Sequence, residues 1–144
     1  MLSTNFYLHF MGNTEEAMNF YKSLFGGEFE SFTRYADVPG GEKMSALDQR
    51  KIMHASLPIA KGQMIMATDT LESMGRDVVF GNNYHICLDA ESEAEVDKIF
   101  TGLSAGGVVE APLNKTFWGA YFGMCDDKFG VKWMINYTYP KTKK

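Results

Sequence analysis

Apolar and polar positions follow the same order in both halves of the chain. In each half a strand-like segment leads into a helical pattern, residues 5–11 before 13–27 and residues 83–90 before 92–107. Apolar residues then recur at helical spacing, namely Ala17, Phe20, Tyr21 and Leu24 in the first helix and Val96, Ile99, Phe100 and Leu103 in the second. The two helical patterns begin about 80 positions apart. This periodicity predicts a duplicated unit.

The ends of both predicted helices carry recognisable signals. Asn13 and Ser92 are each followed three residues later by a glutamate, which is the spacing of a capping box that satisfies free amides of the first turn. Paired glycines at 26–27 and 106–107 supply the left-handed backbone that ends many helices. We therefore expect one capped helix in each half.

Three more strand-like segments follow each helix, at 28–36, 51–59 and 63–69 and then at 108–117, 119–126 and 131–139. The chain is thus expected to be α+β: tandem βαβββ repeats in a single domain over 1–144, with repeats at about 1–69 and 83–144. Two mixed four-stranded sheets, each covered by one helix, would face each other across a cleft, the default place for a small ligand. Residues 37–50 form a polar loop whose length and glycines permit a lid.

Composition narrows the possible partners. The 144 residues include 14 Lys and Arg against 18 Asp and Glu, a net charge of −4, which argues against a nucleic-acid partner. No apolar run reaches the roughly 18 residues that span a bilayer, and the first residues do not read as a signal peptide. With only Cys87 and Cys125, a cytoplasmic protein with reduced thiols is expected.

Nearly the whole chain resembles a known family. The similarity lies in "YLHFMGNTEEAMNFYKSLFGGEF", "MHASLPIAKGQMIMATD" and "PLNKTFWGAYFGMCDDKFGVKWMIN". These segments resemble the PhnB-like branch of the vicinal oxygen chelate superfamily, also named 3-demethylubiquinone-9 3-methyltransferase-like. The resemblance implies the glyoxalase/bleomycin resistance/dihydroxybiphenyl dioxygenase fold and a C2 homodimer. No methyltransferase motif is visible in the sequence.

The superfamily also implies a divalent metal held by His and Glu, one ligand from each of four strands. The positions that match are Phe6, Met66, Met134 and one position between Asn83 and His85. Phenylalanine offers no lone pair, and a methionine sulfur suits copper(I) rather than the metals that these enzymes use. We therefore expect that the metal site is lost and that no other cofactor is needed.

Two histidines are candidate catalytic bases. His54 and His85 lie on predicted strands that enter the cleft, and an imidazole titrates near neutral pH. Either one can instead be a structural histidine with a satisfied hydrogen bond. Asp126 and Asp127 are adjacent, so they would point to opposite faces of a strand, and we expect them in a turn with Gly130.

The aromatic residues and the ten methionines are mostly expected in the core, and a subset is expected to line the cleft. The expected cleft residues are Phe6, His54, Met66, His85, Trp118, Tyr121 and Met134. The favoured function is metal-free binding of a small molecule, whose identity the sequence does not name. The alternatives are a glyoxalase-type lyase or isomerase, with a metal or a histidine base, and a dimeric interaction module.

Overall fold

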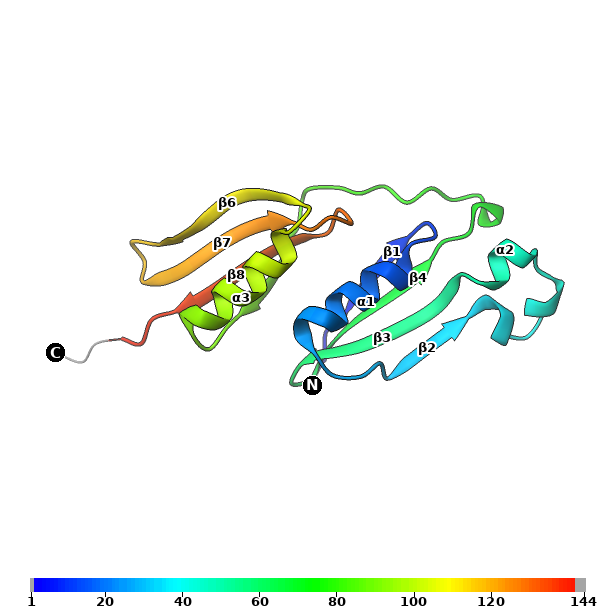
Figure 1. The fold of residues 1–144 in the computed structure, drawn as a ribbon, viewed down its shortest axis with the longest axis horizontal. Helices are drawn as coiled ribbons and strands as arrows, with labels where there is room; N and C mark the ends of the chain where they lie inside the picture. The colour runs from blue at the N-terminus through cyan, green and yellow to red at the C-terminus, as the bar shows by residue number, and fades with distance from the viewer. Residues whose placement is uncertain (1, 142–144) are drawn as a thin grey trace. The chain divides into compact units, whose positions relative to one another are not determined.

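The computed structural model describes residues 2–141 and divides the chain into two compact units, one ending at Val79 and the other beginning at Phe80 (Figure 1). Each unit contains one long helix and one four-stranded sheet. The sheets are mixed, because one pair of strands in each runs parallel and the other pairs run antiparallel.

The first unit begins with a parallel pairing of strands that are distant in sequence. Its main elements are β1 (Phe6–Phe10), α1 (Thr14–Phe25), β2 (Ser31–Arg34), β3 (Ile52–Ala60) and β4 (Gln63–Asp69). The strand order is β1-β4-β3-β2, so β1 lies beside the last strand of its own unit.

The second unit repeats this topology. Its elements are β5 (Ile86–Asp89), α3 (Glu93–Ser104), β6 (Val108–Lys115), β7 (Ala120–Asp126) and β8 (Lys132–Thr138). The strand order is β5-β8-β7-β6, which corresponds strand for strand to the first sheet. The structure thus confirms the α+β class, the βαβββ repeat and the two mixed four-stranded sheets.

Each helix covers one face of its own sheet (Figure 1). Ala17, Met18 and Tyr21 of α1 are buried, as are Ile65 and Ala67 of β4, which alternate with less buried residues. In the second unit the fully buried residues include Val96 and Leu103 of α3 and Trp133 and Ile135 of β8. Full burial of each large apolar side chain contributes about 1.5–3 kcal/mol, so these covered faces form the cores.

Only one of the two expected capping boxes is present. Ser92 Oγ accepts a hydrogen bond from the backbone N–H of Glu95 at 3.1 Å, as predicted. The prediction for Asn13 is wrong, because its side chain makes no capping hydrogen bond. Asp69, from the end of β4, accepts hydrogen bonds from the N–H groups of Gly12 and Thr14 instead. A distant carboxylate therefore replaces the local cap.

The connecting segments contain short helices. The predicted loop 37–50 overlaps η1 (Tyr35–Asp37) and includes η2 (Gly41–Lys43) and α2 (Ala46–Gln49). This segment therefore has more regular structure than the polar loop that the sequence predicts. The segment that connects β4 to β5 contains η3 (Glu72–Met74).

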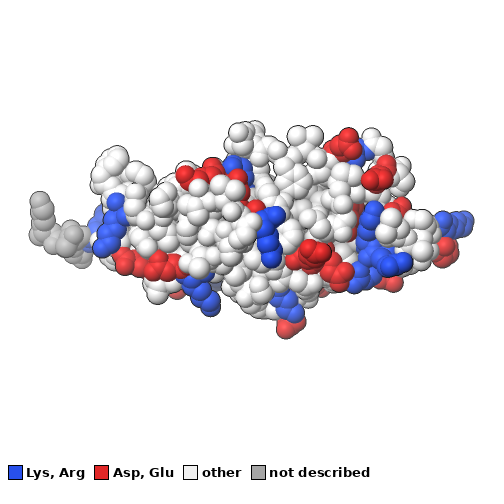
Figure 2. Space-filling view, turned by 45° about the horizontal axis from the view of Figure 1, so that its top comes forward, with Lys and Arg blue, Asp and Glu red and all other residues white. Residues whose placement is uncertain are grey.

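Charged side chains of both signs are interspersed on the face that Figure 2 shows. Within residues 2–141, none of the helices has both the length and the apolar character that a membrane span requires.

Candidate functional site

The face of the first sheet that α1 leaves uncovered carries aromatic, imidazole and thioether side chains. Phe6 pairs with the buried Ile65, so the next pair along, Tyr7 and Met66, lies on the opposite, helix-free face. His54 lies on the same face, because it alternates with the buried Ala55 of β3. We refer to this surface as the first helix-free face, and it consists of Tyr7, His9, His54, Ser56, Met64, Met66 and Thr68.

Three rings lie next to one another on this face. The ring centroid of Tyr7 is 5.3 Å from that of His9 and 5.7 Å from that of His54. The Tyr7 hydroxyl is 3.2 Å from Nδ1 of His54, within hydrogen-bond distance. Burial raises the pKa of the Tyr7 phenol, the charge of Tyr35 adds to this, and a hydrogen bond with Thr68 acts in the opposite direction. The Tyr7 hydroxyl is therefore protonated at neutral pH.

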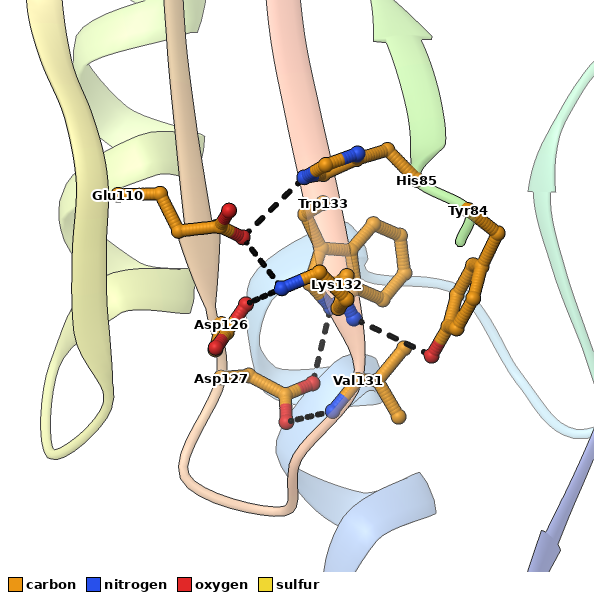
Figure 3. Close-up of polar contacts among 8 residues, drawn as sticks. All are labelled: Tyr84, His85, Glu110, Asp126, Asp127, Val131, Lys132 and Trp133. Carbon is orange, nitrogen blue, oxygen red and sulfur yellow. Dashed lines mark hydrogen bonds and ion pairs between the residues drawn. The ribbon is translucent and has the colours of Figure 1, made fainter. Parts of the chain in front are cut away.

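The second sheet also has a helix-free face, and a charged cluster lies at the end of this face beside the turn between β7 and β8 (Figure 3). Lys132 Nζ lies 2.7 Å from both Glu110 Oε1 and Asp126 Oδ1. His85 Nε2 is 3.1 Å from the same oxygen of Glu110. The Lys132 side chain is only 10% exposed, so its charge needs these carboxylates.

The cluster shifts the ionisation of its members. The hydrogen bond from Lys132, with smaller contributions from Asp126 and His85, lowers the pKa of Glu110 to about 2. The hydrogen bonds to Asp126 and Glu110 raise the pKa of the Lys132 ammonium. Glu110 and Lys132 are therefore an ion pair throughout the neutral range.

A hollow of about 550 Å³ lies beside this cluster within the second unit. It is lined by Phe80, Gly81, Asn82, Asp126, Gly130 and Lys132. The Phe80 ring packs over Gly130, where a Cβ would approach that ring to 2.8 Å. Asp127 lies in the adjacent turn and accepts hydrogen bonds from Val131 N–H and Trp133 Nε1 (Figure 3). These contacts agree with the structural role expected for Asp127 in a turn with Gly130. The same expectation for Asp126 is wrong, because Asp126 is the last residue of β7 and its carboxylate binds Lys132.

The seven residues expected in the cleft lie on different faces of the two sheets. His54 and Met66 share the first helix-free face, whereas Phe6 lies on the face that α1 covers. On the second sheet, Met134 pairs with Met124 on the helix-free face, and His85 joins the charged cluster there.

Tyr121 and Trp118 lie elsewhere on the second unit. Tyr121 faces α3, because its hydroxyl donates a 2.6 Å hydrogen bond to Asp97 of that helix. Trp118 lies in the turn between β6 and β7, is 61% exposed, and its ring is 6.2 Å from that of Phe122. The cleft that would unite these residues stays a prediction.

Neither thiol has the surroundings of a nucleophile. Burial raises the pKa of Cys87, and the nearby Asp89 carboxylate adds to that rise. Burial also raises the pKa of Cys125 to about 12, with Asp127 contributing. A high pKa keeps the thiol protonated at neutral pH and therefore unreactive.

The side chains present do not fit the metal site that the superfamily implies. Of the implied positions, Phe6 is covered by α1 and Met66 and Met134 offer only thioethers. His85 is the one nitrogen donor, and the ammonium of Lys132 already lies between the neighbouring carboxylates, where a metal cation would be repelled. Within residues 2–141, no three His, Cys, Asp or Glu side chains are grouped to hold a metal ion.

Two features of these faces were not predicted from the sequence. Tyr7 was missed because the alternation along β1 was assigned one residue out of phase, with Phe6 on the helix-free face. The partners of Lys132 were missed because Glu110 lies 22 residues away in the sequence. A lysine inside the apolar run "GVKWMIN" was the available signal, because a buried ammonium needs an acidic partner.

Comparison with known proteins gives concordant results. The family model described as 3-demethylubiquinone-9 3-methyltransferase matches residues 3–136. Protein YjdN of Escherichia coli (strain K12) is 40% identical over 85 residues, which make up 59% of this chain and 55% of YjdN. The matched stretch thus spans about half the length of this curated relative.

Solved structures agree over almost the full chain. Protein PA1353 from Pseudomonas aeruginosa is 36% identical, with a TM-score of 0.83 and coverage of 96% of this chain and 98% of that one. A PhnB protein from Bacillus cereus is 30% identical, with a TM-score of 0.76 and coverage of 95% and 100%.

A more distant structure shares the fold alone. It is a glyoxalase/bleomycin resistance protein/dioxygenase family enzyme from Burkholderia phytofirmans PsJN, 14% identical, with a TM-score of 0.62 and coverage of 95% and 97%. The family match and these structures lead to one conclusion. The chain belongs to the 3-demethylubiquinone-9 3-methyltransferase-like, PhnB-like family and has the glyoxalase/bleomycin resistance fold.

Proposed function

We propose that this protein binds a small planar molecule, without a catalytic metal, on the first helix-free face. The observation that carries the proposal is the row of three rings formed by Tyr7, His9 and His54, which no helix covers. Tyr7 is 44% exposed, so a large ring of the first unit is available to a ligand.

The chemistry of this face favours a conjugated ring over an aliphatic chain. Aromatic rings prefer offset or edge-to-face contacts with other rings, each worth about 0.5–1.5 kcal/mol beyond the area that they bury. The thioethers of Met64 and Met66 are flexible and polarisable, so they adapt to the outline of a ligand. The hydroxyl and imidazole nitrogens of the same face add hydrogen bonds that orient polar substituents.

The two helix-free faces also differ in the charged groups that they carry. On the first face the polar contact joins the Tyr7 phenol to the His54 imidazole and includes no carboxylate or ammonium. On the second face the ammonium of Lys132 is already bonded to two carboxylates. Covering those charged groups with a neutral planar ligand would cost more hydration free energy than covering the first face, so we assign the binding site to the first face.

We further infer a homodimer. Each four-stranded sheet has two outer strands, β1 and β2 in the first unit and β5 and β6 in the second. Outer strands present unpaired backbone groups, and pairing or packing against a second copy covers them. Light scattering coupled to size-exclusion chromatography measures this directly, and a mass equal to one 16.2 kDa chain at micromolar concentration would contradict the dimer.

The binding proposal is tested by fluorescence titration with N-phenyl-1-naphthylamine, an uncharged aromatic probe, followed by competition with other uncharged planar compounds. Tyr7→Leu removes the central ring and should weaken probe binding by about 3–10-fold, which corresponds to the loss of ring contacts. Tyr137→Leu is the matched control, because Tyr137 pairs with Tyr121 on the α3 side of the other sheet. Equal effects of the two substitutions, or no binding by the native protein, would refute the proposed site.

A further inference from the structure

We propose that Tyr7 and His54 form a proton-transfer pair, so that the first helix-free face can deprotonate a planar carbon acid as well as bind it. This inference rests on the proposed function, because the substrate is held by the same ring face. The proposed reaction is tautomerisation of a conjugated carbonyl compound, in which a proton leaves carbon and returns at another atom.

The geometry supports a linked pair rather than two separate side chains. The Tyr7 hydroxyl and His54 Nδ1 are 3.2 Å apart, and the two residues are 47 positions apart in the sequence. Tyr7 comes from β1 and His54 from β3, and β4 lies between these strands. The phenol therefore reaches across β4 to the imidazole. Three hydrogen-bonded strands hold both side chains, which fixes their separation without a mobile loop.

The surroundings of Tyr7 keep its hydroxyl protonated at rest. The titratable groups that act on the pair are His9, whose ring contacts Tyr7, and Tyr35, whose charge would raise the pKa of Tyr7. Tyr35 itself is buried and donates a hydrogen bond to the backbone oxygen of Asp69 at 2.8 Å. With Tyr7 as the donor, Nδ1 of His54 is the acceptor, so the proton of the neutral imidazole is on Nε2.

The proton-transfer step balances without any other reactant. A proton leaves a carbon next to the substrate carbonyl and binds the Tyr7 oxygen, while the hydroxyl proton of Tyr7 moves to Nδ1 of His54. The electron pair of the broken C–H bond enters the conjugated carbonyl and gives an enolate. His54 becomes an imidazolium, and its charge stabilises that enolate. Return of the proton to another atom of the substrate completes the tautomerisation and restores the pair.

Two observations set this pair apart from the other histidine contacts in the described residues. The Nε2 of His85 faces Glu110, whose carboxylate is also bonded to Lys132, so that imidazole is part of an ionic network. His9 contacts Tyr7 through its ring. Within residues 2–141, His54 is the histidine whose ring nitrogen lies within hydrogen-bond distance of a tyrosine hydroxyl, and that tyrosine is itself partly exposed.

The catalytic test uses 5-nitrobenzisoxazole, a planar carbon acid that opens when a base removes its ring C–H proton. The C–H electron pair forms the nitrile, the N–O bond breaks, and the ring opens to a coloured cyanophenolate. We expect saturable turnover at least about 100-fold above buffer at the same pH, a contribution typical of a positioned base. His54→Gln should reduce turnover to background. Tyr7→Phe should also reduce turnover to background while the compound still raises the melting temperature, because this change removes the oxygen that accepts the proton and keeps the ring.

The pH dependence and the tautomer distinguish proton transfer from a structural role. The native rate should show a rise with pH that is absent in His54→Gln, as expected for a general base. Nitrogen NMR of the neutral imidazole should show an unprotonated Nδ1 at His54. Tyr137→Phe is the matched control and should leave both readouts unchanged, because Tyr137 lies in the other sheet, where its ring packs against that of Tyr139.

The outcomes separate this inference from the proposed function. If 5-nitrobenzisoxazole raises the melting temperature of the native protein but is not turned over, or if His54→Gln retains the native rate, the proton-transfer pair is refuted and the binding site stands. A proton on Nδ1 in the neutral imidazole would also refute the pair. If the compound neither shifts the melting temperature nor reacts, both the pair and the binding of such planar molecules are refuted.

Discussion

The carboxylate of Asp127 is expected to be the most important single polar group of the second unit. Asp127 is 3% exposed, and one of its oxygens accepts hydrogen bonds from Phe129 N–H at 2.8 Å and Val131 N–H at 3.1 Å. Its other oxygen accepts the indole N–H of Trp133 at 2.9 Å. Trp133 is itself 0% exposed, so this donor has no access to water. One carboxylate thus closes the β7–β8 turn and satisfies the core tryptophan.

Asp127→Ala removes three charge-assisted hydrogen bonds at once. Each such bond contributes about 1.5–3 kcal/mol net, and a buried donor left unpaired costs about 1–3 kcal/mol. Burial of the native carboxylate also costs it its hydration, and this cost offsets part of the stability that the three hydrogen bonds contribute. We therefore expect Asp127→Ala to lower the free energy of unfolding of the second unit by about 3–5 kcal/mol. Asp127→Asn keeps an acceptor for the turn but places an amide against the indole, so it should cost about half as much.

The assay is urea unfolding followed by tryptophan fluorescence in a Trp118→Phe background. Trp118 is 61% exposed, and its removal leaves the buried Trp133 as the reporter of the second unit. Asp127→Ala, Asp127→Asn and the background protein are compared by their midpoints and slopes. A loss below about 1 kcal/mol for Asp127→Ala would contradict the hydrogen-bond argument.

Three further predictions concern ionisation, helix capping and thiol reactivity. The ion pair with Lys132 lowers the pKa of Glu110 to about 2, so the stability that this carboxylate contributes is present above its unfolded pKa near 4.5 and is lost as pH falls towards 2. Acid titration of the urea midpoint should show this loss in the native protein and not in Glu110→Gln. Ser92→Ala should cost about 1 kcal/mol and Asn13→Ala only a few tenths, since only the serine caps its helix, and equal losses in thermal unfolding would contradict this. In the folded protein, Ellman's reagent should modify the exposed Cys87 slowly and the buried Cys125 only after unfolding; fast reaction of both would be inconsistent with their raised pKa values.

Strand and helix positions were predictable because local periodicity reports them. The segment 63–69 was expected as a strand and is β4, and the two helices lie inside the predicted ranges. The duplicated order was equally accessible, because each half repeats the same sequence of strand and helix signals. The pairing of β1 with β4 and of β5 with β8 then reproduces the fold of the family.

The face on which each strand residue lies was harder to predict, because a strand changes faces at every residue. Phe6 and Tyr7 are neighbours, and placing Phe6 instead of Tyr7 on the helix-free face replaces a phenol beside an imidazole with an inert ring. The helix cap supplied by Asp69 and the ion pairs of Lys132 were hard to predict for the same reason, because they join residues that strand register brings together. Local sequence patterns carry little information on such contacts.

Methionine methyl NMR measures ligand binding on the first helix-free face most directly. Met66 lies on this face, whereas Met18 is 0% exposed beneath α1 of the same unit and serves as the internal control. Titration with N-phenyl-1-naphthylamine, an uncharged compound whose rings shift nearby methyl signals, should move the Met66 signal in a saturable manner and leave Met18 in place. A saturable shift at Met18 with none at Met66, or no shift at either, would contradict the assignment of this face as the binding site.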